Sequence, residues 1–178
     1  MTFPRMTQSA CSLLIAFTLT AGMSPANAQE TCIMPAPTQE TDVTTRNEAI
    51  VRQAFDNWVE GGNVFAELLA PNIRWTIRGS GPVARTYTGM EDFVEQGSLP
   101  LISRLSTPLV PEVHDIWAVG DTVIVRFDGS ATTTSGAPYA NQFVWIFQMA
   151  DGVVTEAEAF LDLAAYQEVV DNNEPRAN

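Results

Sequence analysis

The stretch from Asp121 to Asp162 constrains the fold most, because it is typical of three consecutive antiparallel strands. Apolar, β-branched and aromatic residues alternate with polar ones along it, and Gly-containing turns interrupt the pattern. Alternating apolar residues bounded by such turns predict β-hairpins. The three predicted strands cover residues 122–128, 139–147 and 153–161.

The register of the first hairpin decides where a charged pair lies. Side chains alternate between the faces of a strand, so Arg126 and Asp128 share one face. If Ser135–Gly136 forms a two-residue turn, Arg126 lies opposite Trp145 and Asp128 opposite Phe143. The pair would then lie beside the aromatic row of the second strand. That face is either the wall of a pocket or a mixed surface, and the sequence leaves both interpretations open.

Helical patterns precede these strands. Two capping boxes, Thr45 with Glu48 and Thr88 with Glu91, predict the starts of two helices. Between them, a short helix is expected over 64–69. Helices followed by antiparallel strands predict an α+β fold, in which the N-terminal helices pack on one face of a curved antiparallel sheet.

The start of the chain has the features of a secretory signal peptide. Arg5 precedes an apolar run, and a small-x-small cleavage site ends at Ala28. We therefore expect export to the periplasm or the medium after cleavage near Ala28. The predicted organisation is a signal peptide (1–28), a flexible lead-in (29–43), a single domain (44–170) and a disordered tail (171–178).

Composition excludes several classes of partner and chemistry. The formal net charge of −12 leaves no basic patch for nucleic acid or an anionic membrane surface. No segment after the signal peptide is long and apolar enough to insert into a membrane. His114 is the only histidine, and Cys32 is the only cysteine after the signal peptide. We therefore expect no metal site, no cofactor and no nucleophilic triad, and interpret His114 as structural.

Five short motifs follow one another in a characteristic order. They are Tyr87-Thr-Gly89, Val119-Gly-Asp121, Ser135-Gly-x-x-Tyr139-x-Asn141, Asp151-Gly152 and Phe160-Leu-Asp162. Together with the order of the elements, they resemble the nuclear transport factor 2-like superfamily, in its SnoaL-like branch. The resemblance implies a cone-shaped curved sheet with a pocket on its concave side, and a homodimer formed through the sheet. It leaves function open, because members include ketosteroid isomerases, polyketide cyclases, epoxide hydrolases and binding proteins.

The resemblance also bears on catalysis. Arg126-Phe-Asp128 is similar to the Arg-x-Asp of the limonene epoxide hydrolase branch, in which two carboxylates act as acid and base. The second Asp of that branch falls at Ala159, and its water-holding Tyr and Asn fall at Trp75 and Ile77. The two carboxyls of the ketosteroid isomerases likewise align near side chains that transfer no proton, Ile77 and Phe143. Small residues at Ala157 and Ala159 predict a widened, mainly apolar cavity.

We interpret the domain as one that binds a small, mainly apolar molecule in its cone. The candidate ligand-binding residues are Trp75, Ile77, Tyr87, Asn141, Phe143 and Trp145, with Arg126 and Asp128 as further polar contacts. The alternative is an isomerase, cyclase or epoxide-hydrolase-like enzyme, with Asp128 as general base and Arg126 orienting it. Asp128 would then have a raised pKa beside Phe143. A filled cone would instead favour a dimerising scaffold.

Overall fold

The structure is a computed structural model that describes residues 39–177. The expected signal peptide, Cys32 and residues 29–38 of the expected lead-in lie outside the described residues. Residues 39–43 of that lead-in are helical, so the predicted flexibility is wrong for them. Within the described part, no helix combines the length and the apolar character needed to cross a membrane.

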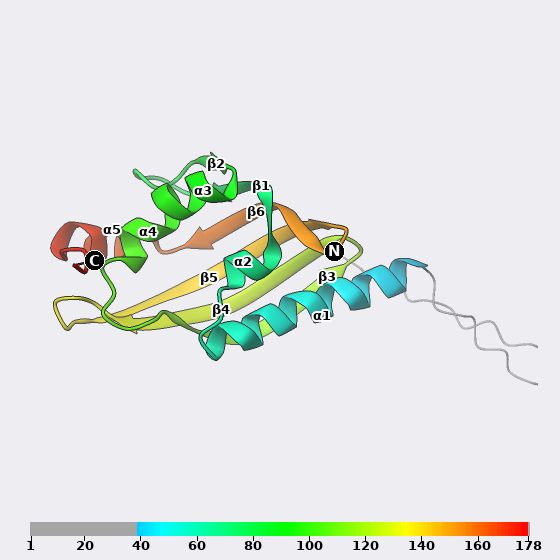
Figure 1. Cartoon of the computed structure of the whole chain (residues 1–178), viewed down its shortest axis with the longest axis horizontal. Helices are drawn as coiled ribbons and strands as arrows, with labels where there is room; N and C mark the ends of the chain where they lie inside the picture. The colour runs from blue at the N-terminus through cyan, green and yellow to red at the C-terminus, as the bar shows by residue number, and fades with distance from the viewer. Residues whose placement is uncertain (1–38, 178) are drawn as a thin grey trace, which may run out of the picture. The chain divides into compact units, whose positions relative to one another are not determined.

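The fold is α+β, with a six-stranded curved, open sheet in the order β2-β1-β6-β5-β4-β3 (Figure 1). The sheet is mixed, because β1 and β6 pair in parallel and every other neighbouring pair is antiparallel. In chain order the elements are α1 (Gln39–Val59), α2 (Val64–Leu68), β1 (Leu69–Ile77), β2 (Thr86–Thr88), α3 (Met90–Phe93), the π-helical turn η1 (Val94–Ser98), α4 (Leu99–Ile102), β3 (Val110–Val119), β4 (Thr122–Thr132), β5 (Pro138–Ala150), β6 (Val153–Leu161) and α5 (Leu163–Asn172). The expected fold class, with its three consecutive antiparallel strands, is confirmed.

Two helix starts differ from the sequence prediction. Helix α1 begins at Gln39, and the Thr45 hydroxyl donates inside it to the carbonyl of Thr41 at 3.0 Å. Helix α3 begins after Gly89, while Thr88 belongs to β2 and its N–H donates to the Asp92 carboxylate at 3.1 Å. The helix starts predicted from the two capping boxes are therefore wrong. The same residue types also occur within a helix, as at Thr45, and at the end of a strand, as at Thr88.

The short helix α2 follows the expected local rules. The side chain of Asn63 accepts from the N–H groups of Phe65 and Ala66, both at 3.1 Å. These bonds satisfy two of the free donors at the helix start. The short helix expected over 64–69 is thus present, as Val64–Leu68.

The predicted disordered tail is wrong for residues 171–177. Helix α5 starts at Asp162, whose carboxylate accepts from two backbone N–H groups, and continues to Asn172. Beyond it, Arg104 donates to the Asn173 carbonyl and Thr134 to the Glu174 carbonyl, both at 2.8 Å. Two separate segments, residues 103–104 and Thr134, supply polar partners, since the Arg176 N–H also donates to the Ser103 carbonyl. The composition of the tail could not reveal them.

The two faces of the sheet differ in burial, and we call them the inner and outer faces. The inner face is buried; its side chains include Trp75, Ile77, Val123, Val125, Phe127, Tyr139, Asn141, Phe143, Trp145, Phe147, Ala157 and Ala159. The alternate residues form the outer face, which is partly exposed; among them are Arg74, Thr76, Arg78, Ile124, Arg126, Asp128, Val144, Ile146, Glu156, Glu158 and Phe160. Helix α1 lies along β3 and β4 (Figure 1).

Candidate functional site

The hairpin of β4 and β5 has a different register from the one expected. Arg126 pairs with Val144 and Asp128 with Gln142, while Phe127 lies opposite Phe143. The loop is one residue longer than a Ser135–Gly136 turn, because the Thr133 N–H donates to the Ala137 carbonyl at 2.8 Å and Thr134 joins the loop. A shift of one residue moves side chains to the opposite face. Arg126 and Asp128 therefore lie on the outer face, away from the aromatic row.

The charged pair forms a cluster with the only histidine. A bulge between Val113 and Asp115 turns His114 toward Asp128, with 3.1 Å between His114 Nε2 and Asp128 Oδ2. Arg126 Nη1 donates to the other oxygen of the same carboxylate. These two contacts, led by the Arg126 hydrogen bond, hold the pKa of Asp128 below its ordinary value. The expected raised pKa is therefore wrong, and Asp128 is ionised near neutral pH.

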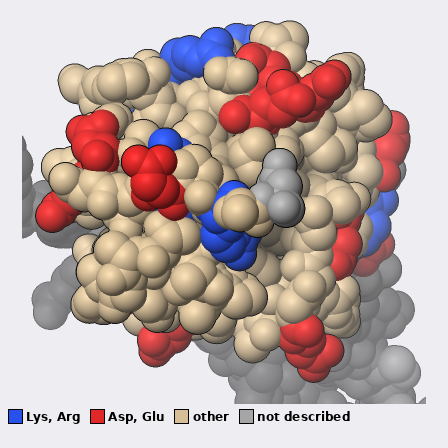
Figure 2. Space-filling model, turned by 60° about the vertical axis from the view of Figure 1, so that its left-hand side comes forward, with Lys and Arg blue, Asp and Glu red and all other residues tan. Residues whose placement is uncertain are grey.

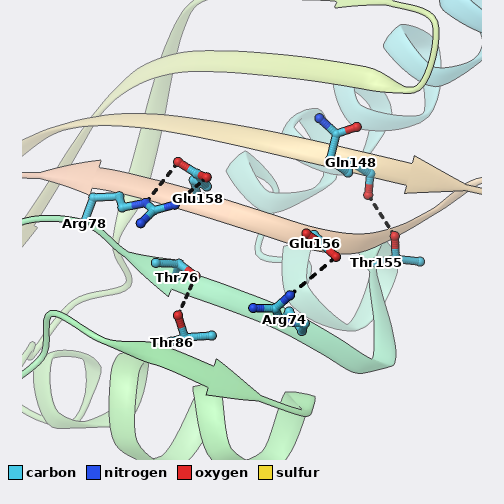
Figure 3. A network of polar contacts seen from close by, with 8 residues as sticks. All are labelled: Arg74, Thr76, Arg78, Thr86, Gln148, Thr155, Glu156 and Glu158. Atoms are coloured by element: carbon cyan, nitrogen blue, oxygen red, sulfur yellow. Dashed lines mark hydrogen bonds and ion pairs between the residues drawn. The ribbon is translucent and has the colours of Figure 1, made fainter.

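The cluster borders an open groove of about 610 Å³ on the outer face. Arg126, Asp128, Gln142 and Phe160 contribute to its lining. Further across this face, Arg78 pairs with Glu158 at 2.7 Å and Arg74 with Glu156 at 3.8 Å (Figure 3). Both glutamates therefore lie on the outer face, away from the cone. Exposed ion pairs of this kind contribute little to stability.

A separate cavity of about 80 Å³ lies against the inner face. Its walls are almost entirely apolar and come from the sheet and from every helix; they are Trp58, Phe65, Trp75, Ile77, Phe93, Gly97, Ser98, Leu101, Ile102, Leu109, Phe143, Trp145, Ala159, Leu161 and Tyr166. The expected apolar cavity is present, but it is narrow. Closely packed rings occupy most of the cone: Trp75 stacks on Phe93 with 4.1 Å between ring centroids.

Few polar groups border this cavity. The Tyr166 hydroxyl donates to the Gly97 carbonyl at 3.2 Å, and burial raises the pKa of this phenol. The indole N–H of Trp75 is buried, and the described residues offer it no hydrogen-bond partner. A buried donor without an acceptor is costly, and a ligand oxygen is one way to satisfy it.

A wider groove of about 420 Å³ continues from this cavity to the surface, and we call it the mouth. Five residues line both spaces: Trp58, Phe65, Ser98, Ile102 and Leu109. The rest of the mouth is formed by Gly61, Gly62, Asn63, Val64, Val94, Leu99, Pro108 and Arg176. The cavity and the mouth thus form one site that opens between the end of α1, η1, α4 and the C-terminal tail.

The structure brings only part of the expected site together. Four of the candidates, Trp75, Ile77, Phe143 and Trp145, line the cavity. Tyr87 does not; its hydroxyl donates to the Val83 carbonyl at 2.7 Å, and its ring packs against Gly97, where a Cβ atom would lie 3.1 Å from Cζ.

Asn141 also has a structural position. Its side-chain oxygen accepts from the N–H groups of Asp162 and Gln142, and its amide donates to the Asp162 carbonyl and the Tyr139 hydroxyl. All of its polar atoms thus serve to join the end of β6 to β5. The wall residues that the sequence analysis missed come mostly from helices, where an apolar pattern indicates burial but not the partner; they are Trp58, Phe65, Phe93, Leu101, Ile102 and Tyr166.

Comparison with protein families gives a match over residues 51–157 to the model of the SnoaL-like domain. Comparison with curated protein sequences gives no match.

Several solved structures share the fold. A protein from Jannaschia sp. CCS1, described provisionally as a SnoaL-like polyketide cyclase, is 21% identical, with a TM-score of 0.58 over 78% of this chain and 100% of that one. Bal32a, from a soil-derived mobile gene cassette, is 19% identical with a TM-score of 0.59, over 71% of this chain and 97% of its own. TerC, co-crystallised with polyporic acid, is 19% identical with a TM-score of 0.57, over 71% and 99%. At these identities the similarity shows the fold alone.

Proposed function

Because this chain belongs to the SnoaL-like domain family, we propose that it binds a small, mainly apolar molecule in the cavity of its inner face. The observation that carries the proposal is the apolar cavity itself, which is enclosed by rings and connected to the surface through the mouth. Small-ligand sites are typically apolar spaces with a few polar groups. TerC, which shares the fold, was co-crystallised with polyporic acid.

The size of the site limits the ligand. A cavity of about 150 Å³ is enough to hold benzene in an engineered protein. The inner cavity here is smaller, at about 80 Å³, whereas the mouth adds about 420 Å³. A ligand of one or two rings would therefore place one edge in the cavity and the remainder in the mouth.

The chemistry of the walls favours binding over acid–base catalysis. Among the described residues that line the cavity or the mouth, none carries a carboxyl or imidazole group. Asp128 and His114 lie on the other side of the sheet, and the lowered pKa of Asp128 makes it a poor proton acceptor near neutral pH. Of the described residues that line the cavity, Tyr166 alone is titratable, and its phenol is neutral near neutral pH.

Calorimetric titration with 2-naphthamide, a neutral two-ring probe, tests the proposal. We expect a Kd on the order of 0.1 mM for the unmodified protein, from the usual affinity per heavy atom of small ligands. Ala159→Leu fills the cavity and should weaken binding about tenfold, since it removes space at the wall. Asp128→Asn should leave the affinity unchanged. Equal binding by Ala159→Leu, or no binding by the unmodified protein, would contradict the proposal.

We also propose that a second copy of the chain covers the outer face. Trp117, Ile124 and Ile146 align across three neighbouring strands, and Val144 with Phe160 continues this apolar strip. Trp117 is 52% exposed and Phe160 42% exposed, although both are large and apolar. A continuous exposed apolar strip rimmed by charged residues is typical of a protein–protein interface.

Sedimentation equilibrium tests the dimer. The unmodified protein should sediment as a dimer at micromolar concentration, and Ile146→Asp, in the middle of the strip, should sediment as a monomer. Val153→Asp is the matched control, because Val153 is also an exposed apolar residue but begins β6 at the β5–β6 turn. A monomer in the unmodified protein, or a dimer that Ile146→Asp does not weaken, would refute this arrangement.

Export is the third part of the proposal, and it is supported by the sequence of residues 1–28. Mass spectrometry of the protein recovered outside the cytoplasm should find a chain that begins near Gln29. A full-length chain retained in the cytoplasm would contradict export.

A further inference from the structure

The charged residues near the site carry a further inference. Every described residue that lines the inner cavity is uncharged, and Arg176 is the one charged side chain among the described residues that line the mouth. The position of a single cation beside an apolar space can select the chemical class of ligand. The question is whether Arg176 is available to a ligand.

The backbone holds Arg176 in place. Its N–H donates to the Ser103 carbonyl at 2.8 Å, just after α4. Its guanidinium Nη2 lies 3.4 Å from the carbonyl oxygen of Ile102, a residue that lines both the cavity and the mouth. The C-terminal tail is thus fixed to the edge of the mouth. The guanidinium lies there with one long hydrogen bond and unused donors.

Most of the other described arginines have carboxylate partners. Five of them pair with carboxylates, namely Arg52, Arg74, Arg78, Arg85 and Arg126. Within residues 39–177, no carboxylate forms an ion pair with Arg176. Arg46 and Arg104 also lack an ion pair among the described residues, but neither of them lines the cavity or the mouth.

The surface agrees with this electrostatic arrangement. Figure 2 shows the side of the molecule that carries α5 and the β4–β5 loop. Basic side chains lie near the middle of this view with an acidic side chain beside them, and most of the other acidic side chains lie toward the edges. An anion near the acidic rim is repelled, whereas an anion at the basic centre is attracted. Only a ligand with a localised negative charge gains from this pattern.

We propose that the site takes monoanionic ligands, whose apolar ring enters the inner cavity while the anionic group lies in the mouth against Arg176. The inference rests on the proposed function and adds the chemical class of the ligand. A guanidinium binds carboxylates and other planar anions through two parallel N–H donors. The ligand class is therefore small aromatic or alicyclic acids, including acidic enols and phenols.

Two nearly isosteric probes separate charge from shape. 2-Naphthoate carries a carboxylate where 2-naphthamide carries a neutral amide. The unmodified protein should bind 2-naphthoate about fivefold more tightly than 2-naphthamide, the upper range for an exposed ion pair. Higher salt should reduce this preference without changing the affinity for the amide.

Three variants test whether Arg176 causes the preference for 2-naphthoate over 2-naphthamide. Arg176→Gln should abolish it by weakening the binding of 2-naphthoate much more than that of 2-naphthamide, while Arg176→Lys should retain part of it. Arg46→Gln is the matched control, since Arg46 is an exposed arginine on α1 that lines neither the cavity nor the mouth. This control should keep the full preference.

The outcomes that overturn the inference differ from those that overturn the proposed function. Binding of both probes with equal affinity, or a preference that survives Arg176→Gln, overturns the anionic ligand class alone. Equal weakening of both probes in Arg176→Gln also overturns it, because Arg176 would then act only by fixing the tail. Binding of neither probe by the unmodified protein overturns the proposed function, and this inference with it.

Discussion

The inner and outer faces of the sheet are built from alternate residues of the same strands, yet they have opposite chemistry. On β5, Trp145 points inward and is 5% exposed, whereas its neighbours Val144 and Ile146 point outward. On β4, Phe127 points inward and is fully buried. Its neighbours in the sequence, Arg126 and Asp128, point outward and belong to the charged cluster. The inner face holds rings and a cavity, and the outer face holds ion pairs and an apolar strip.

The comparison shows how strongly function depends on register. With Thr134 outside the loop, Arg126 and Asp128 would line the cone, and a catalytic site would be the natural conclusion. With Thr134 inside the loop, the same residues lie outside, and the cone has no carboxylate among its described lining residues. One residue in a loop thus separates a predicted acid–base site from an apolar cavity.

The largest difference between the faces should appear in the stability of two tryptophan variants. Trp145→Ala removes a buried ring that contacts several others, and should lower the free energy of unfolding by about 3–5 kcal/mol. Trp117→Ala removes a half-exposed ring from the outer face and should cost about 1 kcal/mol or less. Urea unfolding of both variants measures the difference. A similar loss of unfolding free energy in both variants would show that side chains on the two faces are packed equally closely.

The inner face should determine stability at alkaline pH. Burial raises the pKa of Tyr139 to about 12, because the phenolate is disfavoured where Tyr139 packs. Its contribution to stability is fully present below the ordinary tyrosine pKa of about 10 and is lost as pH rises toward 12. The loss should reach about 2–3 kcal/mol.

Tyr139→Phe tests this assignment, since it keeps the ring and removes the titrating hydroxyl. The variant should lose less stability between about pH 9 and pH 11 than the unmodified protein, as measured by urea unfolding. If both proteins show the same alkaline slope, Tyr139 is not the group that titrates.

The outer face should respond at the opposite end of the pH scale, with a smaller effect. The lowered pKa of Asp128 stabilises the fold at neutral pH, and this contribution is lost as pH falls through the lowered pKa. Asp128→Asn should therefore show a shallower loss of stability in acid. Asp56→Asn is the control, because Asp56 is an exposed aspartate outside the Arg126–Asp128–His114 cluster. Acid unfolding curves that coincide for all three proteins would argue against the cluster.

Local pattern was sufficient to predict the strands and the separation of their faces. Trp75 and Ile77, named as candidates from the sequence, lie on the buried side of β1, and the small residue Ala159 of β6 lines the cavity as expected. Pattern was insufficient where a structure depends on distant partners. The pattern identifies the helix residues Phe65 and Phe93 as apolar but does not show that they pack against each other. The tail is ordered by Arg104 and Thr134, which lie far away in the sequence.

The register of the β4–β5 hairpin was predicted wrongly for a physical reason. Ser135-Gly136 suits a two-residue turn, but a three-residue loop with glycine at positive φ is also common in hairpins. Gly136 has a φ of 86°, and Thr133 closes the loop with Ala137. Both loops use the same glycine, so the sequence alone does not distinguish them.

The four tryptophans offer the most direct test that the cavity of the inner face is the binding site. Trp58, Trp75 and Trp145 line the cavity, whereas Trp117 lies half-exposed on the outer face. Each indole N–H gives one signal in a ¹⁵N–¹H NMR spectrum, which can be followed during titration with 2-naphthamide. We predict that the three inner signals shift, Trp75 among them, and that Trp117 does not. A shift of Trp117 alone would contradict the account and place the ligand on the outer face.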